Sequence, residues 1–455
     1  MDRTLNKEIL RLSIPSILAN LTVPLVGFVD TAIAGHLPHG ASSGTAAFIG
    51  AISIGAMLFN LLYWNFGFLR TGTGGLTAQA FGRQDPHDCA RIFVRGEGLA
   101  LAISAVILLL QWPFFHLVML FVDTSSEVAR YAGEYFFARI WAAPATLSLM
   151  AFSGWFVGMQ DSVSSMFKDL VVNGVNIVAS LVLALGVGPW QGMGFVGIAW
   201  GTVIAQYAGL LYCCAVAALK YRKVFATIGT SDFALIFRGP EIKGYFKMNA
   251  YLFGRSVFFI VIYIGYTIIA ATLGDVLLAC SSILMQVLMI FSYFTDGFAY
   301  AGEALCGRFI GARDSVMMRR TVRYVFVWSM SIAVVFIALY AGLSTPLTRL
   351  LTDDAAVVDT CRTYLPWLLL MPPLGCAAFT WDGIYLGATA SKGICLSMMW
   401  AAVAFFAVWT AGKLALGPEP GTLMHVLMAA YFAHLAARTV CQSVRYRRDV
   451  VAAIK

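Results

Sequence analysis

The chain has 455 residues, of which 60% are hydrophobic and 12% are charged, and its mean hydropathy is +0.79. Soluble proteins carry about 25% charged residues, so this composition excludes a soluble globular protein and is typical of a membrane protein. The formal net charge of +8 does not indicate binding to nucleic acid, because the basic residues fall on one side of the predicted membrane, as the positive-inside rule requires.

Twelve apolar segments are each long enough to cross a bilayer as a helix, which takes about 20 residues. The predicted spans are 9–36, 45–70, 92–118, 128–158, 164–186, 193–219, 245–273, 277–307, 321–345, 357–387, 393–416 and 421–443. The first span is too long for a signal peptide and lacks a small-residue cleavage site, so we expect it to be retained. The sequence therefore predicts an all-α integral membrane protein with twelve transmembrane helices.

The distribution of basic residues predicts the orientation of the chain. Lys and Arg cluster before span 1, after spans 2, 6 and 8, and at the end of the chain, for example at Arg3, Lys7, Lys220, Arg319 and Arg445. The loops on the other side carry few basic residues. Because cytoplasmic loops are the ones enriched in Lys and Arg, we expect a multi-pass protein of the inner (plasma) membrane with both termini in the cytoplasm.

An internal repeat divides the chain into two halves of six helices. Residues recur at an offset of 229, so that Gly82, Asp85, Tyr135, Pro144, Gly154, Gly158 and Ser162 become Gly311, Asp314, Tyr364, Pro373, Gly383, Gly387 and Ser391. Since six is an even number, both halves have the same orientation, which predicts a pseudo-two-fold axis along the membrane normal and a substrate path between the halves. We expect an N-terminal bundle over 1–219, a cytoplasmic linker over 220–244 and a C-terminal bundle over 245–455.

Span 1 contains one carboxylate, Asp30, six residues after Pro24 in an otherwise apolar segment. A charged group at mid-bilayer depth costs roughly 2.5–3.5 kcal/mol on insertion scales, so it rarely lies there without a function or a partner. Its predicted neighbours include no base, only Asn and Thr donors. Pro24 removes a backbone donor and frees a carbonyl, which favours a kink in a helix that lines a cavity. Asp30 thus indicates a transporter.

Spans 5 and 6 carry polar side chains that the second half lacks. One face of span 5 holds Asn173, Asn176 and Ser180, and one face of span 6 holds Thr202 and Gln206. A purely architectural role would be expected in both halves, so the asymmetry favours a role in ion coupling. The alternative is that the two Asn side chains bond across helices, at about 0.6 kcal/mol each.

The second half has its own set of polar residues. They are Asp296 and Glu303 in span 8, Asp382 in span 10, Arg255 in span 7, and Tyr266, which corresponds to Asp30 in the repeat. We expect these five side chains to face the substrate cavity, where the acids supply a negative potential. The alternative for Glu303 and Asp382 is an ion pair with Arg255 or Arg308.

Signatures of catalysis are missing from the sequence. It contains no GxSxG, HExxH or Walker A string, and its nine cysteines lack CxxC spacing. We therefore expect no enzymatic activity, no cofactor and no metal site. Without a nucleotide site, transport must be driven by an ion gradient.

Three strings resemble the multidrug and toxic compound extrusion (MATE) family, specifically its DinF-like branch. They are VPLVGFVDTAIAGHL at 23–37, FLRTGTGGLTAQAFG at 68–82 and DGFAYAGEALCGRFIGARD at 296–314, and the likeness extends to DGIYLGAT at 382–389. The resemblance implies a V-shaped transporter that exports organic cations in exchange for protons or sodium ions. It also implies that Asp30 is the coupling carboxylate, that Pro24 bends span 1, and that Asn176 and Thr202 belong to the first-lobe cation site.

The chain departs from this branch at Ser180, where an acid is usual. With one negative charge fewer, the first-lobe site is a poorer cage for sodium, whereas a buried Asp30 with hydroxyl and amide partners can still bind and release a proton. We therefore expect a monomeric antiporter that binds protons, organic cations and membrane lipids. The alternatives are sodium-coupled antiport, a lipid-linked precursor flippase, which would need several cationic cavity residues besides Arg255, and an intramembrane enzyme.

Overall fold

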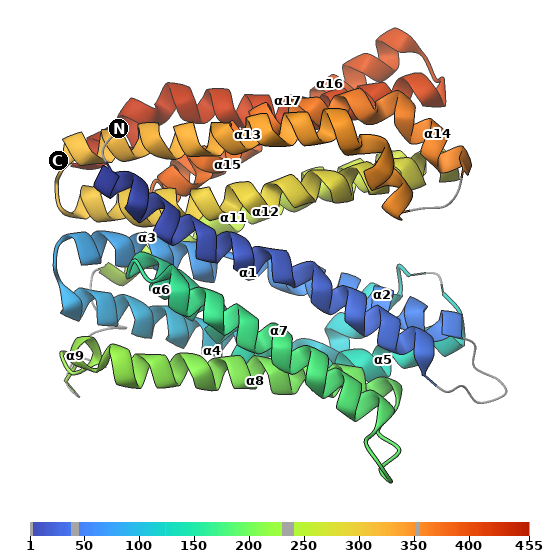
Figure 1. Cartoon of the computed structure of the whole chain (residues 1–455), viewed down its shortest axis with the longest axis horizontal. Coiled ribbons are helices and arrows are strands. Elements are labelled where there is room, and N and C mark those ends of the chain that lie inside the picture. The colour runs from blue at the N-terminus through green and yellow to red at the C-terminus, as the bar shows by residue number, and fades with distance from the viewer. Residues whose placement is uncertain (1–2, 38–44, 123, 230–240, 352–354, 455) are drawn as a thin grey trace. The chain divides into compact units, whose positions relative to one another are not determined.

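The computed structural model describes residues 3–37, 45–122, 124–229, 241–351 and 355–454. Within these ranges every secondary-structure element is a helix. The only β-pairing there is an isolated bridge between Val187 and Trp190. Figure 1 shows the helices as long, roughly side-by-side rods within each part of the chain. The predicted all-α membrane fold is confirmed.

The helices of the first repeat are joined by short connections. They are α1 (Arg3–His36), α2 (Thr45–Tyr63), η1 (Trp64–Phe66), α3 (Phe68–Gly82), α4 (Pro86–Met119), α5 (Ser126–Arg139), η2 (Ile140–Ala142), α6 (Ala143–Gly158), α7 (Ser162–Leu185), α8 (Phe195–Lys220) and α9 (Arg222–Phe225).

The second repeat follows the same order. Its elements are α11 (Glu241–Ala271), α12 (Asp275–Gly311), α13 (Ser315–Leu351), α14 (Ala355–Tyr364), η3 (Leu365–Leu370), α15 (Met371–Gly387), α16 (Ser391–Leu416), α17 (Pro420–Asp449) and η4 (Val451–Ile454).

Eleven segments of the described chain are long and apolar enough to cross a membrane. The predicted span that is not among them is the tenth, 357–387, which consists of α14, η3 and α15 rather than one continuous helix. Pro366 lies in the 3₁₀ segment, and Pro372 lies at the start of α15. Proline has no backbone N–H to donate, so it interrupts a helix or begins a new one. Span 2 also extends beyond its predicted end, because α3 continues to Gly82.

Close contacts divide the chain into two compact units. Unit 1 contains Met1–Ile17, Ala78–Gln84 and Lys243–Lys455, and unit 2 contains Leu18–Thr77 and Asp85–Ile242. These units follow the predicted halves except for two segments of the first half that group with unit 1. Of the predicted linker 220–244, residues 230–240 lie outside the described part.

Within each unit a glycine sits directly on the backbone of a neighbouring helix. A Cβ on Gly154 of α6 would overlap the carbonyl oxygen of Arg70, and a Cβ on Gly383 of α15 would overlap that of Ala299. The two contacts are related by the 229-residue repeat. Small residues allow helices to approach this closely in a membrane, so the repeat seen in the sequence corresponds to a repeated helix crossing.

A second pair of glycine contacts lies inside unit 1. A Cβ on Gly82 would overlap the carbonyl oxygen of Arg308, and a Cβ on Gly311 would overlap that of Gln79. Both contacts join the end of α3 to the end of α12, and the Gln79 side chain also donates to the carbonyl of Gly387 at 2.9 Å. This close packing explains why residues 78–84 group with the second half.

A third helix crossing occurs at corresponding positions in both units, but the glycine lies on the second helix of the pair in unit 2 and on the first helix in unit 1. In unit 2, Gly197 of α8 lies against the backbone of Leu183 on α7. In unit 1, Gly412 of α16 lies against the side chain of Val426 on α17. Gly412 corresponds to Leu183 and Val426 to Gly197, so each crossing has one small residue, on opposite partners.

We expect Gly383→Ala to destabilise the protein. The new methyl group would meet the Ala299 carbonyl, and overpacking of this kind costs about 1–3 kcal/mol. The measurement is thermal unfolding of the full chain in detergent. The matched control is Gly342→Ala in α13, where a Cβ would have nothing within 4 Å. Equal midpoints for the two variants would contradict the prediction.

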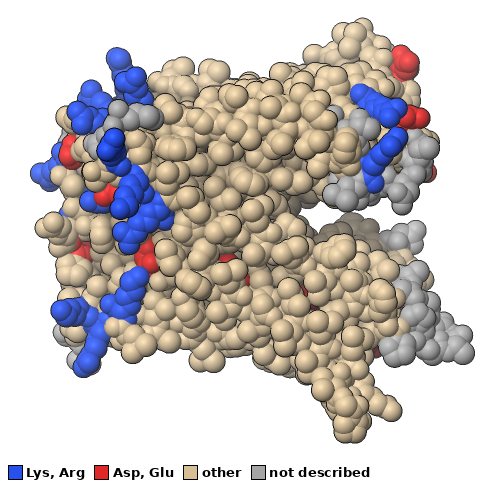
Figure 2. All heavy atoms as spheres, in the orientation of Figure 1, with Lys and Arg blue, Asp and Glu red and all other residues tan. Residues whose placement is uncertain are grey.

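Most of the basic side chains visible in Figure 2 lie at the left-hand end of the view, and a smaller group lies at the right-hand end beside acidic side chains. In unit 1 this end carries both chain termini (Figure 1) and the basic residues at the start of α13 and the end of α17. In unit 2 it carries Lys220, Arg222 and Lys223 around α9. These are the residues that the sequence predicts to face the cytoplasm.

Candidate functional site

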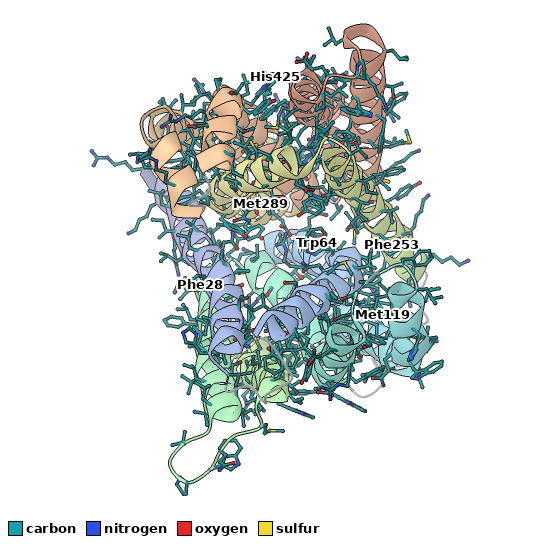
Figure 3. The ribbon with its side chains drawn as sticks, turned by 90° about the vertical axis from the view of Figure 1, so that its right-hand side faces the viewer. Phe28, Trp64, Met119, Phe253, Met289 and His425 are labelled. Carbon is teal, nitrogen blue, oxygen red and sulfur yellow. The ribbon has the colours of Figure 1, made fainter. Side chains whose placement is uncertain are left out.

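The candidate coupling carboxylate is buried in unit 2. Asp30 lies near the end of α1 and is 5% exposed, whereas Phe28, labelled in Figure 3, is 75% exposed. The helical assignment of α1 is unbroken through Pro24. The helix therefore turns Asp30 inward and presents its apolar neighbour outward, as expected for a span that faces lipid on one side.

Two side chains act on the Asp30 carboxylate. The Ser180 hydroxyl of α7, which donates to the Ile198 carbonyl at 3.4 Å, also interacts with this carboxylate, and the Arg139 guanidinium of α5 interacts with it electrostatically. The Oδ1 atom of Asp30 is buried and has no hydrogen-bond partner among the described residues. Asp30 thus has one acceptor oxygen available for a proton or a ligand.

The expectation that no base lies near Asp30 is wrong, because Arg139 is close enough to interact with it. Arg139 donates from Nη1 to the Tyr135 hydroxyl at 2.7 Å, and its guanidinium lies 4.6 Å from the centre of the Phe59 ring. These contacts hold the cation in place. The sequence signal was an arginine inside predicted span 4, which is rare enough in a membrane helix to indicate a partner.

The polar residues of α7 and α8 form bonds between helices. Asn176 donates from Nδ2 to the Thr202 hydroxyl at 3.0 Å, and Asn173 donates to the hydroxyl of Thr22 on α1 at 2.5 Å. The Oδ1 atom of buried Asn176 has no hydrogen-bond partner in the described part of the chain. The bonding of Asn side chains across helices, the architectural alternative, is therefore present, and it leaves one amide oxygen available.

Ser180 lies where α7 and α8 are closest. It is fully buried, and a Cβ on Gly201 of α8 would overlap its side-chain oxygen. Gln206 lies one turn beyond Thr202 on α8 and is partly buried. Unit 2 thus brings Asp30, Ser180 and the Asn176–Thr202 pair onto facing helices.

The predicted residues of the second half are dispersed through unit 1. Glu303 is fully buried on α12, and Asp296 of the same helix is partly buried and interacts electrostatically with Tyr293. Tyr266 is 3% exposed, its hydroxyl is 3.5 Å from the Met428 sulfur, and its ring packs edge-on against Tyr431. Tyr266 therefore belongs to the packed apolar core of the unit.

Asp382 is the centre of a buried charge network in unit 1. Its carboxylate accepts hydrogen bonds from Arg255 at 2.5 Å, from Arg438 Nη2 at 2.7 Å and from Gln442 at 2.7 Å. For Asp382, the alternative given above, an ion pair with Arg255, is therefore the one that is present. Arg308 forms its ion pair with Glu8, at 3.4 Å. Because two guanidinium groups contact Asp382, it does not supply an unbalanced negative charge.

Sequence reasoning missed Arg438 and Gln442 of α17. Arg438 is 2% exposed, and it also donates to the Ala378 carbonyl at 3.3 Å. The available signal was the spacing of Arg438 and Gln442, which lie four residues apart and hence on one face of a helix. Their partner could not be identified from spacing alone.

A bound metal ion would need a group of side chains that could act as its ligands. In the described ranges, no three His, Cys, Asp or Glu side chains are arranged to hold a metal ion. Among the predicted site residues, the buried acids are Asp30, Glu303 and Asp382. A proton or a small ligand is what such groups can bind.

A repeated bundle of apolar helices with buried carboxylates defines an integral membrane protein of the secondary-transporter class. The chain belongs to the MatE family, whose model matches residues 15–182 and 252–410. The two matched ranges cover one repeat each. The resemblance identified from the sequence is thereby confirmed, and the family is one of multidrug efflux transporters rather than of enzymes.

Relatives agree with this assignment. The chain is 32% identical over 445 residues to the DNA damage-inducible protein F of Escherichia coli (strain K12), which covers 97% of this chain and 92% of the relative. A multidrug resistance MATE transporter of the MOP superfamily, solved in an outward-facing conformation, matches with a TM-score of 0.84 at 17% identity, over 99% of this chain and 97% of that chain. A MATE protein solved in complex with MaD3S matches with a TM-score of 0.82 at 18% identity, over the same shares. At these identities the solved structures establish the fold alone.

Proposed function

We propose that this protein is an inner-membrane antiporter that exports amphipathic organic cations in exchange for protons, with both termini in the cytoplasm. The observation that carries the proposal is the buried Asp30 carboxylate, whose Oδ1 atom has no hydrogen-bond partner among the described residues. An ionisable group inside a membrane helix is by default a candidate for an ion pathway. The multidrug efflux transporters of the family supply the class of substrate.

The surroundings of Asp30 favour a proton over a sodium ion. The Arg139 cation nearby opposes the binding of either cation to Asp30, so the discrimination comes from the ligands: a sodium ion prefers several charged oxygen ligands, and Asp30 is the one carboxylate of this proposed site. A proton instead binds covalently to one oxygen of the Asp30 carboxylate, and the resulting O–H group needs one hydrogen-bond acceptor. The available Oδ1 atom of Asn176 is such an acceptor, on the helix face that carries Ser180. Ser180 itself brings a hydroxyl and no negative charge.

The remaining polar residues position this site. Asn173 ties α7 to α1 through Thr22, and Thr202 holds the amide of Asn176. Gln206 extends the polar face of α8. In this proposal Pro24 lets α1 bend when Asp30 gains or loses a proton. Asp296 and Glu303 supply the negative potential that attracts the organic cation.

The test is transport by the purified full chain in vesicles with imposed gradients. We expect a pH gradient in sodium-free buffer to drive the movement of a fluorescent organic cation, and a sodium gradient at equal pH to drive little. Sodium-driven transport that does not respond to pH would overturn the proton assignment. Movement that responds to neither gradient would overturn antiport altogether.

A further inference from the structure

Unit 1 contains more positive than negative charge around Asp382. In the described part of the chain, Arg255 and Arg438 each have Asp382 as their ion-pair partner. One carboxylate between two guanidinium groups leaves one positive charge in excess. An uncompensated charge is costly at this depth in a protein, so the excess points to a missing anion.

The two arginines differ in how firmly they are held. The Arg438 side chain is 2% exposed and bonds to both oxygens of Asp382 and to the Ala378 carbonyl. Gln442 donates a further hydrogen bond to Asp382. Asp382 thus remains paired and hydrogen-bonded when Arg255 is removed, which makes Arg255 the exchangeable cation of the network.

Arg255 retains donor capacity in its present position. Its side chain is 25% exposed and bonds to Asp382 through Nη2, whereas its buried Nε atom has no hydrogen-bond partner among the described residues. A guanidinium group presents five N–H donors in a fixed fork that matches the two oxygens of a carboxylate. The partly exposed end of the guanidinium group, rather than its buried Nε atom, is the part that is able to bind a second oxyanion.

The depth of Arg255 excludes a simple surface role. It lies fourteen residues after the start of α11, which corresponds to roughly 21 Å along a helix axis. Phe253, two residues earlier and labelled in Figure 3, is 42% exposed on the same helix. A cation that contacts hydrocarbon at this depth would be strongly disfavoured, so the exposed quarter of Arg255 requires water or an anionic partner.

We infer that Arg255 binds the carboxylate of an amphipathic organic compound, while Asp382 is kept neutralised by Arg438 and Gln442. The inference rests on the proposed function in that the ligand is taken to be a transported compound. It adds a second chemical requirement to the substrate class: compounds that carry a carboxylate beside their cationic group are bound better than their esters, which keep the cationic group but lack the carboxylate.

The test compares two dyes that differ in one functional group. Tetramethylrhodamine has a free carboxylate, and its methyl ester does not. Binding of each to the full-length protein in non-ionic detergent is measured by fluorescence anisotropy, without any ion gradient. A charge-assisted bond is worth about 1.5–3 kcal/mol, so we expect the acid to bind at least about tenfold more tightly than the ester.

The variants separate the anion site from general packing. Arg255→Gln is expected to weaken binding of the acid about tenfold while leaving the ester unchanged, and Arg255→Lys to retain part of the preference. Lys247→Gln, which removes a charge from an exposed position of α11, is expected to change neither affinity. Equal binding of acid and ester to the unmodified protein, or an equal loss of both in Arg255→Gln, would overturn the inference.

A lipid competitor distinguishes the possible source of the anion. Phosphatidylglycerol added to the micelles is expected not to displace the acid dye, because a phosphate headgroup belongs at the membrane surface. Displacement would overturn the assignment to a carboxylate compound and assign the site to a lipid. Since binding is measured without a gradient, these outcomes are independent of whether protons drive transport.

Discussion

Replacing Asp382 by Asn is expected to destabilise the protein by about 3–5 kcal/mol, the usual effect of removing one partner from a buried ion pair. The substitution keeps the size of the side chain, so the change comes from charge and not from a cavity. Arg438, with a side chain that is 2% exposed, would lose its acidic partner. The measurement is unfolding of the detergent-solubilised protein by heat and by denaturant.

Two comparisons make this stability prediction specific. Glu134→Gln breaks the exposed pair of Arg130 and Glu134, and surface pairs contribute about 0–1 kcal/mol, so its midpoint should hardly change. Adding Arg438→Met to Asp382→Asn removes the stranded cation and should restore part of the lost stability. A midpoint for Asp382→Asn that equals that of Glu134→Gln would show that the network does not stabilise the fold.

Replacing Asp30 by Asn is expected to reduce gradient-driven export to the rate of protein-free vesicles. Asn has the same shape as Asp but cannot exchange a proton, so substrate movement would lose its link to the pH gradient. The fold should be unaffected, because the carboxylate is buried without the dense network that surrounds Asp382. Transport in vesicles and thermal unfolding of the same preparation measure both parts of the prediction.

The matched control for this variant is Asp275→Asn, which neutralises an exposed acid at the start of α12. It should export at the rate of the unmodified protein. If Asp30→Asn also exports at that rate under a pH gradient, Asp30 is not the coupling residue. If instead Asp30→Asn fails to fold, Asp30 has a structural role that its surroundings do not indicate.

The fold was predictable because membrane helices are specified locally. Each span needs a run of apolar residues of a given length, and this requirement can be read from the sequence without knowledge of neighbours. The division of 357–387 into α14, η3 and α15 was also encoded locally, by Pro366 and Pro372. Whether prolines kink a helix or divide it depends on which other groups satisfy the freed carbonyls.

The candidate site was predictable only in part, because its residues come from different helices. Asp30, Asn176 and Thr202 attract notice as polar groups in apolar spans, and the repeat isolates them from polar residues that both halves share. Their interaction partners could not be predicted in this way. Arg139 and Arg438 reach Asp30 and Asp382 across helix boundaries, and the rotation of each helix in its bundle decides such contacts.

The swapped glycine at the α7–α8 and α16–α17 crossings has a consequence for the exchange of helices between the two halves. At each crossing one member of the facing pair is a glycine, which leaves room for the larger residue on the other helix. A chimera that joined α7 to α17 would place Leu183 against Val426, and one that joined α16 to α8 would place Gly412 against Gly197. The first chimera would have a steric overlap at the crossing, and the second would have a cavity there. Helices at corresponding positions in the two halves therefore cannot be exchanged without loss of packing.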